Sequence, residues 1–99
     1  MQIARVKGTV VSTNKADKLM GLKLLVVKPI DLETMQEKGG LLVAIDAVGA
    51  GEGEVVMTVG GSSSRQTNIT DNKPVDCSIV AIIDHIDIEK KRVYDKFGE

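Results

Sequence analysis

The sequence predicts an all-β protein built as a small closed barrel of five strands. Apolar residues recur with period two through most of the chain, the apolar runs are short, and glycines separate them. With 99 residues the chain suits one domain, which we expect to span residues 1–99. Closure of the sheet would remove the unpaired strand edges that a small open sheet exposes.

Five segments carry the strand pattern. In the first, Ala4, Val6 and Val10 share one face, and charged or polar residues interrupt the other. The second ends near Pro29, because proline cannot donate to a ladder. A short pairing strand could return at residues 93–94, after a charged turn at 89–92. The predicted strands cover residues 3–13, 22–30, 41–45, 55–59 and about 78–88.

Two connections could contain short helical turns. Residues 32–38 fit either a short helix or a loop. Residues 62–67 could form one helical turn, with Ser62 or Ser63 capping its first amides. Five short strands with glycine-rich corners resemble the oligonucleotide/oligosaccharide-binding (OB) barrel.

Several strands are apolar on both faces. In a barrel wall with one face in water, apolar and polar residues should alternate along each strand. A monomer would then expose a sizeable apolar band, which soluble monomers avoid. We therefore expect neighbouring subunits to cover it. In the last strand, the two expected apolar faces consist of Val80, Ile82 and Ile86, and of Ile79, Ala81 and Ile83.

Composition narrows the function further. Thirteen basic and fourteen acidic residues give a net charge of -1, so no strong field attracts nucleic acid or an anionic membrane. Cys77 and His85 are the only residues of their types, which predicts neither an intrachain disulfide nor a zinc site. No apolar run has the length of a membrane span, so we expect a cytoplasmic protein without a cofactor or a membrane partner.

The most informative motif is a glycine loop that follows an apolar strand. Its third glycine comes one position too early for a dinucleotide-binding fingerprint, and a strand rather than a helix follows it. We interpret it as a structural turn or an interface loop, with its two glutamates as solvated charges. The candidate loop consists of Gly49, Ala50, Gly51, Glu52, Gly53 and Glu54.

A second motif, Gly-Gly-Ser-Ser-Ser-Arg, ends at Arg65. It could cradle an anion through backbone amides, but it lacks the Lys-Ser/Thr end of a phosphate loop. Arginine behind a serine turn can bind carboxylate or carbonyl groups in a fixed fork. We expect Ser63, Ser64 and Arg65 to anchor contacts within or between subunits. No base accompanies Cys77 or His85, so we predict no catalysis.

Taken in order, several blocks resemble one family across nearly the whole chain. They are Met-x-Ile-Ala-x-Val-x-Gly-Thr-Val-Val-Ser-Thr at the start, Leu-Leu-Val-Val in the second strand, the stretch from Asp46 to Glu54, Gly-Ser-Ser-Ser-Arg at 61–65, and Pro-Val-Asp-x-x-Ile-Val-Ala-Ile-Ile-Asp at 74–84. This combination resembles the vertex proteins of bacterial microcompartments, of the EutN/CcmL type. Residues 93–96 are more similar to the carboxysome branch.

The resemblance implies a structural role. It implies a cyclic homopentamer at the corners of a polyhedral shell, beside hexameric shell proteins, in a carboxysome or a catabolic microcompartment. Flat sheets of six-fold tiles cannot close, and five-fold units supply the curvature. By the same resemblance, the loop at 49–54 could crowd around the central axis, where Glu52 or Glu54 would disfavour anions and Arg65 would favour them.

Two other classes remain as alternatives. A single-stranded nucleic-acid binder could use the same barrel, but such binders use stacking aromatics and a basic groove, and this chain has only Tyr94 and Phe97. A small metabolic enzyme is the third class, and it lacks an assembled acid, base or nucleophile.

Overall fold

The computed structural model describes residues 1–11, 23–60 and 76–98, and every regular element in that part of the chain is a β-strand. None of the described residues belongs to a helix long and apolar enough to cross a membrane. The strands are β1 (Gln2–Val10), β2 (Lys23–Asp31), β3 (Gln36–Glu37), β4 (Leu42–Asp46), β5 (Val55–Gly60), β6 (Cys77–Ile82), β7 (His85–Ile88) and β8 (Lys91–Asp95).

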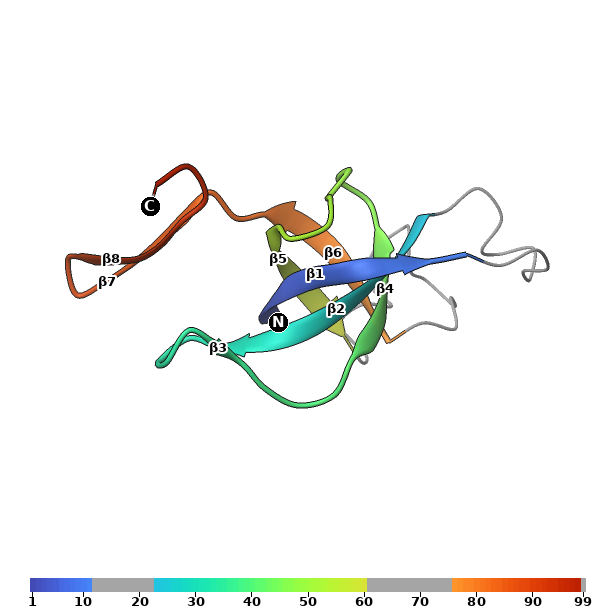
Figure 1. Ribbon diagram of the computed structural model, residues 1–99, viewed down its shortest axis with the longest axis horizontal. Coiled ribbons are helices and arrows are strands. Elements are labelled where there is room, and N and C mark those ends of the chain that lie inside the picture. Colours follow the sequence, from blue (N-terminus) through green and yellow to red (C-terminus); the bar gives the residue numbers. More distant parts are fainter. Residues whose placement is uncertain (12–22, 61–75, 99) are drawn as a thin grey trace.

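Five of these strands close into a barrel, as predicted (Figure 1). Their order around the wall is β1, β5, β6, β4 and β2, and β2 pairs back with β1. All neighbours are antiparallel except β4 and β6, which run parallel. The β1–β2 ladder aligns Val6 with Val27 and shifts register before Gly8, while the β5–β6 ladder shifts between Met57 and Thr58. Such bulges sharpen the bend of a strand and help a small sheet to close.

The barrel interior is filled by small and branched apolar side chains. Alternation in β1 points Ala4 and Val6 inward, where they meet inward residues of the other four strands. Leu42 and Ile82 pack against this cluster from its margin. The buried cluster consists of Ala4, Val6, Leu25, Val27, Ala44, Ala50, Val56, Cys77 and Ile79.

A second buried row lies on the outer side of the same wall. Leu24 pairs with Ile45, Ile45 with Ser78, and Ser78 with Val59 across four adjacent strands. Each of these side chains is buried, and Ile45 is 0% exposed. The doubly apolar character of these strands is therefore satisfied in part within one chain. The apolar band is therefore smaller than the sequence predicted, and the prediction that neighbouring subunits cover it concerns the apolar side chains that stay exposed.

The predicted last strand, 78–88, was wrong in extent, because the chain leaves the barrel within it. β6 ends at Ile82, the amide of Ile83 still donates to the carbonyl of Val55 at 2.8 Å, and β7 then pairs only with β8. Apolar residues return at Ile86 and Ile88, which favours one long strand, and only Asp84 and His85 interrupt the apolar run at the break. Exposed Val80 also lies away from the core that Ile82 contacts, so the predicted face was incorrect.

The β7–β8 hairpin, residues 85–95, forms an arm that projects from the barrel (Figure 1). It confirms the short returning strand expected at residues 93–94. Ile88 pairs with Lys91, so Glu89 and Lys90 form a two-residue turn, with φ values of 53° and 67°. Both positions lie in the left-handed region, as in the type I′ hairpin turn.

The alternatives for residues 32–38 resolve as a turn followed by a strand. A turn spans residues 32–35, the amide of Met35 donates to the carbonyl of Asp31 at 2.6 Å, and β3 then pairs with the end of β2. The helical turn predicted at 62–67 lies outside the described residues.

Candidate functional site

The glycine loop, residues 47–54, folds back over one end of the barrel. Ala50 is 0% exposed and belongs to the core cluster, so the loop closes the barrel end rather than standing free. The amide of Gly53 donates to the carbonyl of Val6 at 2.8 Å, and Arg5 donates to the carbonyl of Gly53 at 2.7 Å. These hydrogen bonds to β1 hold the loop in one conformation.

Asp46 organises the start of the loop. One carboxylate oxygen accepts hydrogen bonds from the amides of Val48 and Gly49, both at 3.0 Å. The other oxygen is buried without a hydrogen bond among the described residues, and Lys23 Nζ lies 3.8 Å from it. The same ammonium donates to the carbonyl of Ala50 at 3.1 Å. Lys23 therefore neutralises the buried carboxylate and holds the loop at the same time.

Glu54 fastens the other end of the loop. Its Oε1 accepts a hydrogen bond from the amide of Gly51 at 2.6 Å, and its Oε2 lies 2.6 Å from Lys96 Nζ. The hydrogen bond from Lys96, followed by that from Gly51, holds the pKa of Glu54 below its ordinary value. The interpretation of Glu54 as a solvated charge was therefore wrong, whereas Glu52 is exposed.

Backbone conformation explains two glycines of this loop. Gly49 has φ +81° and Gly53 has φ +90°, a region that side chains with a Cβ rarely adopt. Gly51 has no such requirement, and a Cβ there would make only ordinary contact with Glu54. The sequence thus predicted the tight turns correctly, but not the bonds that hold them. Ser63, Ser64 and Arg65 lie outside the described residues.

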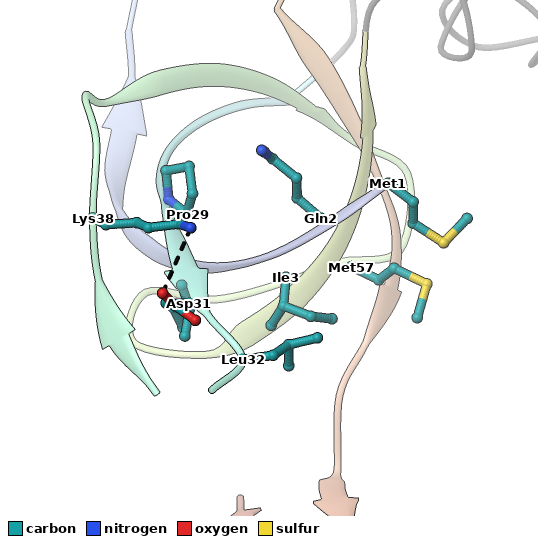
Figure 2. A pocket seen from close by; sticks show the side chains of 9 residues that line it. Met1, Gln2, Ile3, Pro29, Asp31, Leu32, Lys38 and Met57 are labelled. Atoms are coloured by element: carbon teal, nitrogen blue, oxygen red, sulfur yellow. Dashed lines mark ion pairs between the residues drawn. The ribbon is translucent and has the colours of Figure 1, made fainter. Parts of the chain in front are cut away.

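An open hollow of about 440 Å³, which we call the groove, lies on the barrel near the N-terminus (Figure 2). Ile3 and Met57 occupy paired positions on β1 and β5, and Leu32 lies next to them in Figure 2. The carboxylate of Asp31 lies 3.7 Å from Lys38 Nζ at its edge. The lining consists of Met1, Gln2, Ile3, Pro29, Ile30, Asp31, Leu32, Lys38 and Met57.

A second hollow of about 480 Å³ separates the arm from the β2–β3 turn. Leu32 and Glu33 line it from the turn, and Ile88, Glu89, Lys91 and Val93 line it from the arm. Leu32 therefore belongs to both hollows. Apolar side chains of the barrel, the turn and the arm therefore line these two hollows.

The two residues considered for chemistry lie on different elements, Cys77 on β6 and His85 on β7. Cys77 is buried in the barrel wall, where burial, with a smaller effect of Asp76, raises the pKa of its thiol to about 11. His85 is exposed on the arm, with Nε2 at 4.0 Å from Asp87. Within residues 1–11, 23–60 and 76–98, no three potential ligands cluster to hold a metal ion.

Sequence reasoning missed the residues that fix the loop from a distance. Arg5, Lys23 and Lys96 come from β1, β2 and the segment after the arm. No local pattern identifies them, because a lysine on a strand reads as a solvent-facing residue until its partner is known. Asp46 carried a usable signal, since an aspartate before a glycine turn often accepts nearby amides.

These features define a small closed-barrel protein with an ordered glycine loop and a projecting arm. Residues 1–84 match the family described as "Ethanolamine utilisation protein EutN/carboxysome". The carboxysome shell vertex protein CcmL of Synechococcus elongatus is 46% identical, over 97% of this chain and 96% of its own length. The chain belongs to the EutN/CcmL family.

Solved structures agree with this assignment. CcmL of Gloeobacter violaceus superposes with a TM-score of 0.86 at 41% identity, covering 97% of this chain and 98% of that one. GrpN of Rhodospirillum rubrum, a pentameric microcompartment shell protein, gives a TM-score of 0.76 at 41% identity, covering 89% of this chain and 99% of that one.

Proposed function

We propose that this chain is the vertex subunit of a bacterial microcompartment shell. Five copies form a cyclic ring that fills each corner of the polyhedron and borders hexameric shell proteins, inside the cytoplasm. The observation that carries the proposal is similarity over nearly the full chain, in both sequence and fold, to proteins named for this role. The work of such a subunit is geometric, and it needs no cofactor and no catalytic group.

The physical features of the chain support assembly. Three large apolar side chains are exposed, namely Met1 and Leu32 beside the groove and Ile88 on the arm. Contact of such side chains with water is unfavourable in an isolated chain. A cyclic ring of identical subunits uses two different patches on each copy, one for each neighbour. The five described barrel strands pair in a closed circle, so the barrel wall itself does not favour open-ended assembly by strand addition.

Mass measurement tests the ring directly. Light scattering and native mass spectrometry of the purified protein are expected to give five times the chain mass. Co-production with hexameric shell proteins is then expected to yield closed polyhedra. A stable monomer at high concentration would overturn the proposal. So would closed polyhedra that form to the same extent when this chain is omitted.

For the site, we infer that the glycine loop faces the five-fold axis. Glu52 is its exposed charge, whereas Glu54 is already paired with Lys96, so a ring would carry Glu52 as the repeated acidic group. Oxidation of a Glu52→Cys ring should produce covalent dimers. The matched control is Thr9→Cys, an exposed position on β1. Equal cross-linking of the two variants would show that the loop does not face the five-fold axis.

Ser63, Ser64 and Arg65 stay as proposed interface anchors on the grounds of their sequence. A guanidinium can bind two oxygens at once, whereas an ammonium acts as a point charge. Arg65→Lys should therefore weaken the ring while preserving charge. Unchanged dissociation on dilution would reject this role.

A further inference from the structure

Three basic side chains share the outer face of β1 and β2, two strands that lie side by side in the barrel wall (Figure 1). Arg5 and Lys28 are directly opposite each other in the β1–β2 ladder. Lys7 follows at the shift in register, and it lies on the same side of the wall because both Lys7 and Arg5 pair with Glu37. We call the surface formed by Arg5, Lys7 and Lys28 the basic face.

One carboxylate, that of Glu37, neutralises part of this face. Lys7 Nζ donates to both oxygens of Glu37, at 3.0 and 3.1 Å, and Arg5 Nε lies 3.6 Å from one of them. Lys28 forms no ion pair with any described residue. Three cations and one carboxylate leave a charge of +2 on the basic face, in a chain whose overall charge is -1.

The pairing of Arg5 with Lys28 works against the stability of the sheet. Like charges directly opposite each other on neighbouring strands are destabilising. Arg5 is also held in place, because its Nη1 donates to the carbonyl of Gly53 at 2.7 Å. Proteins retain local conflicts of this kind at functional sites. The arrangement therefore indicates a surface that receives an anion.

The surroundings of the basic face select the class of anion. Clusters of about four to eight cations bind anionic membranes, and this face has three cations and an acid. Binders of single-stranded nucleic acid add stacking aromatics, whereas β1 and β2 contain none. Strand addition is also closed, because β1 and β2 each have neighbours on both sides in the barrel. Carboxylates of a protein segment match the face best.

We propose that the basic face docks an acidic segment of a partner protein. A carboxylate placed between Arg5 and Lys28 relieves their mutual repulsion, and the guanidinium is already held in position to receive it. The inference goes beyond the proposed function, because it concerns the outer wall of a single chain and rests on no contact between copies.

A peptide titration tests the docking. The probe is a fluorescein-labelled peptide of alternating glutamate and serine, whose anisotropy is followed as protein is added at low salt. The parent should bind it, and added salt should weaken the complex. Lys28→Glu should raise the dissociation constant at least about tenfold. The matched control is Lys90→Glu, an equal change in charge at the exposed turn of the arm, which should retain the affinity.

Thermal melts separate loss of binding from loss of folding. In Lys28→Glu the new carboxylate would face Arg5 as an opposite charge, so this variant should melt at a higher temperature than the parent while it loses the peptide. A lower melting temperature would overturn the proposal, because the like-charge pair would then not be the conflict on which it depends.

Other outcomes of the titration would also overturn the docking. One is a parent protein that does not bind the peptide. Another is equal loss of affinity in Lys28→Glu and Lys90→Glu, because binding would then follow net charge alone. A third is tighter binding of oligothymidylate or phosphatidylserine vesicles than of the peptide. None of these results changes the mass of the ring, so the proposed function is tested separately.

Discussion

Glu54 and Lys96 join two distant parts of the chain, with the carboxylate Oε2 at 2.6 Å from the ammonium. Glu54 ends the glycine loop and also binds the amide of Gly51. Lys96 follows the arm and binds Asp84 at the arm's root. The position of the arm is thereby coupled to the conformation of the loop.

This coupling predicts a specific dependence of stability on pH. The folded pKa of Glu54 lies below its ordinary value of 4.5, so its contribution is present above that pH and disappears as the pH falls through the folded pKa. Glu54→Gln should lower the melting temperature at pH 7 and reduce the loss of stability on acidification. Thermal melts of both proteins from pH 7 to pH 3 measure the difference. Parallel curves for the two proteins would contradict it.

The lysine side of the pair makes the complementary prediction. The hydrogen bond to Glu54 raises the pKa of Lys96 above 10.5, so its contribution is present below that pH and disappears as the pH rises through the folded pKa. Lys96→Met should therefore destabilise the protein at pH 7 and flatten its alkaline loss of stability. In this variant, backbone amides of both the glycine loop and the arm should exchange their hydrogens faster. A change confined to one of them would show that they are not coupled.

Gly53 should resist substitution for a backbone reason. A side chain at φ +90° adds strain, and the surrounding bonds to Val6 and Arg5 prevent the loop from relaxing. Gly53→Ala should lower the free energy of unfolding by about 1–2 kcal/mol, measured by urea denaturation. Gly40→Ala is the control, because that position has neither a positive φ nor a neighbour within 4 Å. Equal effects at both sites would refute the conformational explanation.

The turn of the arm should be easy to stabilise. Glu89 and Lys90 both adopt left-handed conformations that disfavour ordinary side chains, whereas Asn-Gly suits a type I′ turn. Glu89→Asn combined with Lys90→Gly should stabilise the hairpin by about 1–2 kcal/mol. Slower exchange of the paired amides of β7 and β8 will report the gain, with barrel amides as the internal reference. Faster exchange in the arm would contradict the turn assignment.

Cys77 should be chemically silent until the barrel opens. The residue is 3% exposed and the pKa of its thiol is raised to about 11, so little thiolate is present at pH 8. Alkylation should be slow in buffer and fast in denaturant, as followed by mass spectrometry. Between pH 9 and about 11 the unfolded thiol ionises while the folded thiol does not, so stability should fall there, and less so in Cys77→Ala. Rapid alkylation of the folded protein would place the thiol at the surface.

The sequence alone determined the all-β class, the positions of the five barrel strands apart from the end of the last one, and the need for tight turns in the glycine loop. These features depend on local causes, namely the period of apolar residues and the conformational freedom of glycine. The sequence also indicated the family, because the sequence motifs that resemble it occur in the same order along the chain. The family match later confirmed it.

Only the tertiary structure decided where the chain leaves the barrel and which charges are paired. The apolar run continues to Ile83, one residue past the end of β6, and pairing with Val55 rather than propensity sets where the barrel strand ends. Glu54 and Lys96 look like solvent-facing charges until folding brings them together. Burial of Ile45 on the outer face likewise depends on contacts distant in sequence. The end of β6, the ion pair and the burial of Ile45 all depend on contacts between residues distant in sequence, and a local sequence pattern does not predict such contacts.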